Sequence, residues 1–179
     1  MLVVTKNNQS VFLKKLLPSH LEMLVTYLQN LSQTTKSRFG PHAYDYLSVL
    51  NFYQQNANRM GYIALDESGT NVIAYSIIQI GFLTHDQSRL EGYGITLNAQ
   101  TDATFAPSVA DAWQGQGLGT RLFHFMIADL KTKGVHRLIL WGGVQADNSN
   151  AVSYYQKLGF TTLGQFSYHG ENYDMLLNF

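Results

Sequence analysis

The stretch that decides the fold runs from Val109 to Thr120 and reads VADAWQGQGLGT. Its first residues end a β-rich segment, and three alternating glycines, Gly115, Gly117 and Gly119, open a segment with helical periodicity. Such a turn leaves amide N–H groups unpaired, and the helix dipole adds about half a positive charge at the same place. The stretch therefore predicts a phosphate or pyrophosphate site that needs no lysine, unless the glycines only form a tight strand-to-helix turn.

Two common nucleotide-binding patterns do not fit this glycine loop. A Walker loop would continue with lysine and then serine or threonine, whereas Leu118 follows Gly117. The dinucleotide pattern G-x-G-x-x-G places its third glycine one residue later than Gly119. Both failures lower the weight of an ordinary nucleotide site.

The segments around the loop alternate between helical and extended patterns. Apolar residues at helical spacing run from Gly117 to Lys133 and stop at Gly134, and a helix that Asp147 or Asn148 can cap runs to Leu158. A second helical pair is expected after Pro18 and after Pro41, with Tyr44, Leu47, Leu50 and Phe52 on one face. Strands are expected at 11–17, 61–65, 72–78, 104–110, 136–141, 160–168 and 173–179, with a further strand near 93–97. The expected fold class is one mixed α/β (α+β) domain around a single sheet.

A second motif follows the loop: Asn148 opens the last helix, and Tyr155 lies four residues before Gly159 and Phe160. With this spacing the chain resembles the GNAT superfamily of acetyl-CoA-dependent N-acetyltransferases. The loop of that superfamily reads Arg or Gln, any two residues, Gly, any residue, then Gly or Ala. Gln114, Gly117 and Gly119 fit this pattern.

The resemblance implies a GNAT-like splayed sheet flanked by helices, one domain over residues 1–179 and a cofactor-binding core at about 104–164. It implies that the strand ending near Val109 parts from the strand ending near Trp141, which leaves a cleft for the pantetheine arm of acetyl-CoA. The arm would pair with the backbone of Ser108, Val109 and Ala110, and Asn148 would reach it from the far side. The pyrophosphate would bind the loop residues Gln114, Gly115, Gln116, Gly117, Leu118, Gly119 and Thr120. Tyr155 occupies the position of the family's proton donor to the leaving thiolate.

A proton acceptor is also needed, because an alkylamine with a pKa near 10.4 is mostly protonated at neutral pH. Glu91 is the first choice, since it lies in the strand-like stretch before the cofactor strand, where carboxylate bases of similar enzymes often sit. Asp111, His85 and Asp86 are the alternatives, and each is also explained as a solvated loop residue.

Composition excludes several other classes of function. Lysine plus arginine equals aspartate plus glutamate at 12 each, which gives no net field for nucleic acid or an anionic membrane. The chain has no cysteine, and its six histidines are scattered, so neither a disulfide framework nor a metal site is expected. No stretch approaches the roughly 20 apolar residues of a membrane helix, and we expect a cytoplasmic protein.

The function expected from these observations is transfer of an acetyl group from acetyl-CoA to a primary amine by direct attack. The expected acceptor is a small-molecule amine or a protein amine. The sequence is compatible with a homodimer. Two rivals remain: an acyl-CoA-binding module without catalysis, and a regulatory domain that binds a nucleotide. The stretch from Phe39 to His42 is either a turn with a polar histidine or part of the acceptor pocket.

Overall fold

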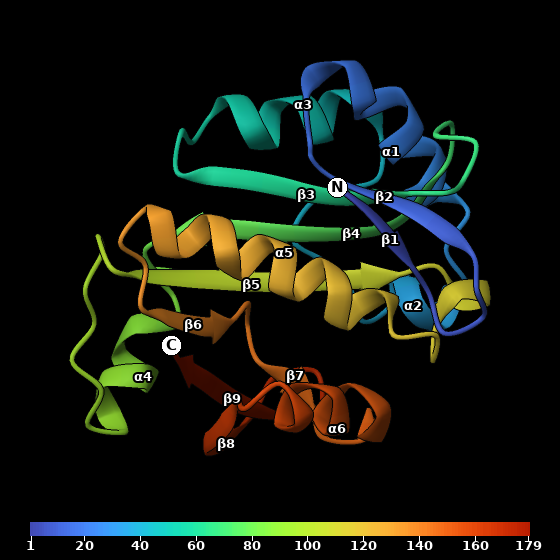
Figure 1. Ribbon diagram of the computed structural model, residues 1–179. Helices are drawn as coiled ribbons and strands as arrows, with labels where there is room; N and C mark the ends of the chain where they lie inside the picture. Colours follow the sequence, from blue (N-terminus) through green and yellow to red (C-terminus); the bar gives the residue numbers. More distant parts are fainter. The chain divides into compact units, whose positions relative to one another are not determined.

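The computed structural model describes all 179 residues and contains one mixed nine-stranded sheet flanked by helices (Figure 1). The strands are β1 Leu2–Val4, β2 Ser10–Lys15, β3 Arg59–Leu65, β4 Val72–Ile80, β5 Asp102–Val109, β6 Arg137–Leu140, β7 Val144–Gln145, β8 Thr161–Ser167 and β9 Glu171–Asn178. The α-helices are α1 Leu21–Gln29, α2 Gln33–Lys36, α3 Tyr46–Gln54, α4 Gln87–Gly92, α5 Leu118–Thr132 and α6 Ser149–Lys157. Two 3-10 turns, Pro18–His20 and Asp111–Trp113, precede α1 and the glycine loop.

The sheet order is β1-β2-β3-β4-β5-β6-β9-β7, with β8 paired to β9. β5 and β6 are parallel, whereas β1–β2, β2–β3, β6–β9, β7–β9 and β8–β9 are antiparallel. This mixed sheet with interleaved helices confirms the expected fold class. The extent of the acetyltransferase domain, 1–179 with a core at 104–164, stays a prediction.

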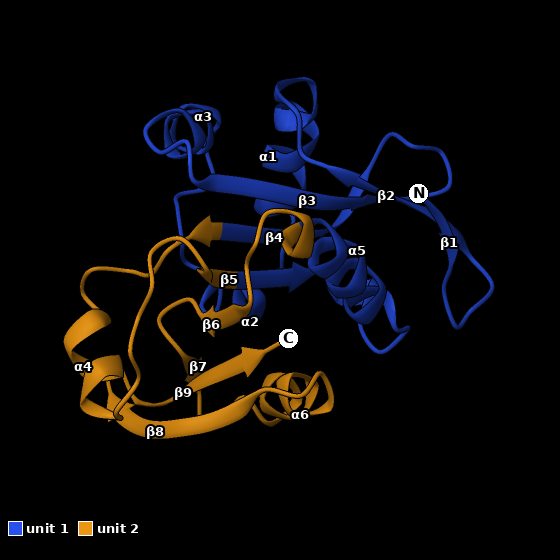
Figure 2. Cartoon of the chain, turned by 60° about the vertical axis from the view of Figure 1, so that its left-hand side comes forward, with its two compact units in different colours: residues 1–78, 106–129 blue, residues 79–105, 130–179 orange.

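The chain forms two compact units, which Figure 2 colours separately. Unit 1 comprises residues 1–78 and 106–129, and unit 2 comprises residues 79–105 and 130–179. The strands β4 and β5 and the helix α5 each contribute residues to both units. The glycine loop therefore belongs to unit 1, and α6 with Tyr155 belongs to unit 2.

In unit 1, the helices α1 and α5 are each fixed to the sheet by a polar contact. Tyr62 of β3 donates a hydrogen bond of 2.7 Å to Asp129 of α5, and Lys15 of β2 pairs with the same carboxylate at 2.6 Å. Tyr27 of α1 donates to Ser108 of β5 at 3.0 Å. These contacts hold α1 and α5 to the strands that lead into the glycine loop.

In unit 2, the short helix α4 is anchored by charge. Arg89 donates to both carboxylate oxygens of Asp174 on β9, at 2.6 and 3.0 Å, and to Asp86 at 2.7 Å. Its guanidinium carbon also lies 3.7 Å from the ring centroid of Phe166, which is a cation–π geometry. The buried side chains of Leu90, Ile139 and Leu176 form the apolar part of the same packing.

Most expected elements are confirmed within about two residues, and the exceptions are one expected strand, one expected helix face and several short elements that were not expected. Residues 93–97 form no strand, and the helix α4 precedes them instead. The strand β1 and the short helix α2 were not expected, and Leu47 is 66% exposed although its spacing placed it on a buried face. The buried residues of α3 are Val49 and Phe52. Short elements escape periodicity because two or three residues cannot define a period.

No helix combines the length and the apolar character that crossing a bilayer requires. The cytoplasmic location stays a prediction.

Candidate functional site

Only the first half of β5 is paired with β6, because the pairing ends at Phe105 and β5 continues to Val109. The parallel register runs from Asp102–Arg137 to Phe105–Leu140, and the amide of Trp141 donates to the carbonyl of Phe105 at 2.9 Å. Alternation along a strand turns the backbone of residue 107 to the same edge as Phe105. Residue 107 is a proline and has no N–H, so this edge cannot continue as a regular ladder.

The same alternation shows which edge of β5 is faced by the backbone of each residue that the sequence assigned to the pantetheine arm, Ser108, Val109 and Ala110. The amide of Ala110 donates to the carbonyl of Ile73 on β4 at 2.9 Å, so this N–H is bonded within the chain, and the role of Ala110 at the arm stays a prediction. Ser108 has the same parity as Ala110, and its hydroxyl already accepts the bond from Tyr27. Only Val109 turns its backbone to the edge that Pro107 leaves unpaired, and its carbonyl accepts from the side chain of Gln114 at 3.1 Å.

The glycine loop has the backbone conformation that its sequence predicts. Gly115 and Gly117 have φ of +74° and +79°, in the left-handed region where a side chain is strained. A Cβ added at Gly115 meets nothing within 4 Å, and the three atoms nearest to one added at Gly117 all belong to the side chain of Lys6. The loop is therefore open at Gly115 and is not crowded by backbone at Gly117, and the side chain of Gln114 is folded back onto the strand end.

The amides that follow the loop have no backbone partner. The first bond of α5 joins the amide of Arg121 to the carbonyl of Gly117 at 3.1 Å, and the amides of residues 118–120 donate to no carbonyl. The side chain of Leu118 is only 1% exposed and anchors this helix start in the core. A rigid helix start with free N–H groups and uncrowded glycines fits a pyrophosphate group.

Asp111 helps to position the loop. Its carboxylate accepts from the hydroxyls of Ser32 at 2.8 Å and Thr35 at 2.9 Å, and from the amide of Ser32. Partial burial alone would raise the pKa of this carboxyl, but the hydrogen bonds outweigh burial and lower it. Asp111 thus stays ionised and ties α2 to the segment before the glycines, a structural role that the sequence did not predict.

The helix α6 carries the second motif. The side chain of Asn148 accepts a 3.3 Å bond from the amide of Ala151, so its oxygen caps the helix and only its amide nitrogen is left for a ligand. Tyr155 is 8% exposed, and its ring packs against those of Phe105 and Phe160. Burial raises the pKa of Tyr155, which keeps the phenol protonated at neutral pH.

Tyr154, beside it, has a feature that sequence reasoning missed. Its hydroxyl oxygen is buried and has no hydrogen-bond partner. Buried polar atoms without a partner are rare in native structures, and each calls for an explanation such as a ligand or an ordered water. The only signal in the sequence was that two tyrosines stand side by side.

The candidate bases are placed differently from the expectation. Glu91 lies on α4 rather than on a strand-like segment, and it is exposed, with the side-chain amide of Gln87 donating to it at 2.9 Å. The strand expectation failed because α4 is short and is held by the distant Asp174, which no local pattern reveals. Asp86 is buried in the ion pair with Arg89, and exposed His85 lies 3.6 Å from it.

Contacts in unit 1 bear on whether residues 39–42 form only a turn with a polar histidine or part of the acceptor pocket. His42 lies against the rings of Phe39, Phe52 and Tyr75, and burial lowers the pKa of its imidazole. Its Nδ1 lies 2.8 Å from the carbonyl of Ala43, which only accepts, so Nδ1 carries the proton. Nε2 then accepts from the hydroxyl of Tyr75 at 3.1 Å.

That hydroxyl in turn is hydrogen-bonded to Tyr53. Tyr53, Tyr75 and His42 thus form a hydrogen-bonded chain of three titratable side chains, and the imidazole of His42 at its end is neutral. His42 is therefore more than a polar turn residue, because it ends a buried hydrogen-bond chain. Elsewhere, the structure brings no three His, Asp or Glu side chains together as a metal-ligating group.

Comparison with known proteins agrees with this geometry. The model of the acetyltransferase (GNAT) family matches residues 25–160. A mycothiol acetyltransferase of Corynebacterium efficiens is 40% identical over 57 residues, which cover 32% of this chain and 19% of that protein. A [ribosomal protein bS18]-alanine N-acetyltransferase of Salmonella typhimurium is 38% identical over 79 residues, which cover 44% and 51%. The chain thus spans about half, or less, of the length of these curated relatives.

Solved structures extend the likeness to the whole chain. The GNAT domain of S. lividans PAT has a TM-score of 0.77 at 19% identity and covers 100% of this chain and 96% of that domain. The structure of yncA from Salmonella typhimurium with its cofactor acetyl-CoA has a TM-score of 0.66 at 17% identity, covering 94% and 93%. Similarity at these identities shows a common fold. With the family match across residues 25–160, the chain belongs to the GNAT family of acetyltransferases.

Proposed function

We propose that this protein transfers an acetyl group from acetyl-CoA to a primary amine by direct attack of the amine. The observation that carries the proposal is the glycine loop: left-handed Gly115 and Gly117, no atom within 4 Å of a Cβ added at Gly115, and amides without a backbone partner at the start of α5. A pyrophosphate accepts hydrogen bonds from such amides and gains from the helix dipole. Residues 114–120 are therefore assigned to the pyrophosphate.

The roles of the strand and of α6 follow from their chemistry. The backbone of Val109, on the unpaired edge of β5, is assigned to the pantetheine arm, and its N–H suits an oxyanion donor. Asn148 is assigned to the arm through its amide nitrogen. The phenol of Tyr155, which burial keeps protonated, is assigned as the proton donor to the leaving thiolate.

The base is assigned to Glu91. Among the four acids and bases weighed, Asp86 is engaged with Arg89, Asp111 holds α2, and His85 lies beside Asp86, whereas Glu91 contacts only the neutral Gln87. A second candidate is His42, which the hydrogen-bond chain through Tyr75 and Tyr53 favours. Comparing the pH dependence of kcat/KM in Glu91→Gln and His42→Gln decides between them, because the variant that lacks the base loses the acidic limb of the profile.

The acceptor is an amine without strong net charge, carried by a small molecule or by a protein. The relatives include enzymes named for an alanine of a ribosomal protein and for mycothiol, so both kinds of acceptor occur among similar proteins. Neither the variable N-terminal half nor residues 83–104 carries a run of one charge sign that would recruit a polyion.

The test is a screen for acetyl-CoA-dependent release of free thiol across amines and N-terminal peptides, with acceptor mass as the second readout. The proposal predicts thiol release that depends on the amine. Thermal stabilisation by acetyl-CoA without turnover on any amine would favour the non-catalytic acyl-CoA-binding module. Stabilisation by ATP but not by acetyl-CoA would favour a nucleotide-binding regulatory domain.

A further inference from the structure

A lysine distant in sequence lies on the glycine loop. The turn between β1 and β2 contacts the loop through its backbone, because the amide of Lys6 donates to the carbonyl of Gln116 at 3.1 Å. The side chain of Lys6 runs across Gly117, with its Cε, Cγ and Cδ atoms 3.5, 3.6 and 3.8 Å from the position of an added Cβ. These are the three heavy atoms nearest to that position. The stem of Lys6 therefore covers the glycine and sets its ammonium group beside the loop.

The turn that carries Lys6 is fixed internally. The amide of Thr5 donates to the carbonyl of Gln9 at 2.9 Å, and the amide of Asn8 donates to the carbonyl of Thr5 at 3.1 Å. Asn8 has φ of +59°, a conformation that asparagine tolerates better than most residues. Thr5 is only 3% exposed. The turn is thus stabilised by its own hydrogen bonds. The amide of Lys6 is not used within the turn and donates to the carbonyl of Gln116 instead.

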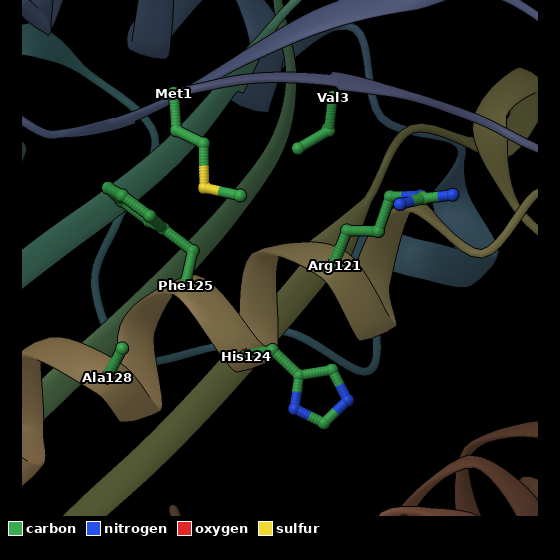
Figure 3. Close-up of a pocket in the computed structure, with 6 residues that line it drawn as sticks. All are labelled: Met1, Val3, Arg121, His124, Phe125 and Ala128. Atoms are coloured by element: carbon green, nitrogen blue, oxygen red, sulfur yellow. The ribbon is translucent and has the colours of Figure 1, made fainter.

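The strand β1 before the turn and the helix α5 line a common groove. A groove of about 280 Å³ is lined by Met1 and Val3 on one side and by Arg121, His124, Phe125 and Ala128 of α5 on the other. Figure 3 shows Met1 facing Phe125 and Val3 facing Arg121. The N-terminal ammonium donates to the carbonyl of Leu13 at 2.9 Å, which ties the chain end to β2. Lys6 is held beside the start of α5 by its own backbone bond to Gln116.

We propose that Lys6 is a phosphate-binding residue of the acetyl-CoA site, donating from its ammonium group to the pyrophosphate held by the loop. This inference rests on the proposed function and adds a cation to a site otherwise built of neutral amides. A lysine ammonium binds phosphate as a point charge, and such charge-assisted bonds are about twice as strong as neutral ones. Lys6 is exposed, so salt should screen the interaction.

The experiment is calorimetric titration of the full chain with acetyl-CoA at low and high salt. Lys6→Met keeps the aliphatic stem over Gly117 and removes only the charge, and Lys6→Arg restores it. The control is Lys14→Met, which makes the same change on β2 at an exposed lysine that faces His20. We expect Lys6→Met to weaken binding roughly tenfold at low salt, with a smaller gap at high salt. Lys14→Met and Lys6→Arg should bind nearly as the wild type does.

Dephospho-CoA, compared with CoA, from which it differs only by the lack of the 3′-phosphate, identifies the group that Lys6 contacts. The Lys6→Met defect should persist with this ligand, because the pyrophosphate is still present. If the defect disappears, Lys6 contacts the 3′-phosphate and the assignment is overturned. Equal affinity and equal salt dependence in wild type and Lys6→Met would also overturn it. A wild-type protein that binds no acetyl-CoA would instead contradict the proposed function itself.

Discussion

The amides that follow the glycine loop are left without backbone partners, whereas the polar groups of the α4 anchor, which consists of Arg89, Asp86 and Asp174, are paired with one another. In the loop, the amides of residues 118–120 have no backbone partner, and a Cβ added at Gly115 would meet nothing within 4 Å. In the anchor, Arg89 donates three hydrogen bonds to Asp86 and Asp174, whose side chains are 4% and 1% exposed. Groups satisfied within the chain point to stability, and groups left free point to a ligand. The predictions below separate those two roles.

Loss of the Arg89 charge should have the largest effect, and it should be on stability alone. Arg89→Met leaves the carboxylates of Asp86 and Asp174 buried without their cation, which typically costs about 3–5 kcal/mol of the free energy of unfolding. Denaturant titration measures it, with Lys133→Met as an exposed charge-matched control. Acetyl-CoA affinity of the folded fraction should not change. An unfolding midpoint equal to that of the wild type would show that the anchor contributes nothing.

The tyrosine pair of α6 gives the next effect, on rate. Tyr155→Phe keeps the ring against Phe105 and Phe160 but removes the proton, so kcat should fall about a hundredfold with little change in acetyl-CoA affinity. Tyr154→Phe is the matched control, and it deletes a buried hydroxyl that has no partner. Its kcat should stay near that of the wild type. The reverse pattern, loss in Tyr154→Phe alone, would move the donor to Tyr154 and explain its unpaired hydroxyl by a ligand.

Sequence reasoning reached the elements whose signals are local. The spacing of Gly115, Gly117 and Gly119 gave the loop, and Gly134 and Gly159, with φ of +77° and +95°, end α5 and α6 where expected. The fold class followed from the alternation of these elements. The assignments of Tyr155 and Asn148 rest on the family resemblance and stay predictions.

What sequence reasoning missed depends on partners far along the chain. α4 is stabilised by an arginine–aspartate pair that spans 85 residues, so its six-residue pattern carried no usable signal, and Glu91 was placed on the wrong kind of element. The contact between Lys6 and Gln116 likewise joins residues that are far apart in the sequence. Pro107 was visible, but only the register with β6 reveals which edge of β5 it interrupts.

The smallest expected effect concerns pH and the buried imidazole of His42. Burial is the main cause that lowers its pKa, the charge of Arg59 adds to this, and the carbonyl of Ala43 and the charge of Asp45 oppose it. The unfolded chain therefore binds more protons below the ordinary value of 6.5, and the free energy of unfolding should fall as pH drops through that region. His42→Gln should flatten this slope, and His169→Gln, at an exposed position, should not. Identical slopes in the two variants would mean that His42 titrates alike in both states.

Acetyl-CoA binding at the glycine loop is the central claim, and one pair of variants tests it most directly. Gly117 and Gly69 have φ of +79° and +72°, and neither is crowded by backbone, so valine imposes a similar strain at both positions. Gly69 lies in the turn between β3 and β4. Calorimetry with acetyl-CoA should show wild-type affinity for Gly69→Val and no measurable binding for Gly117→Val, with both variants folded. Unchanged affinity in Gly117→Val would contradict the account.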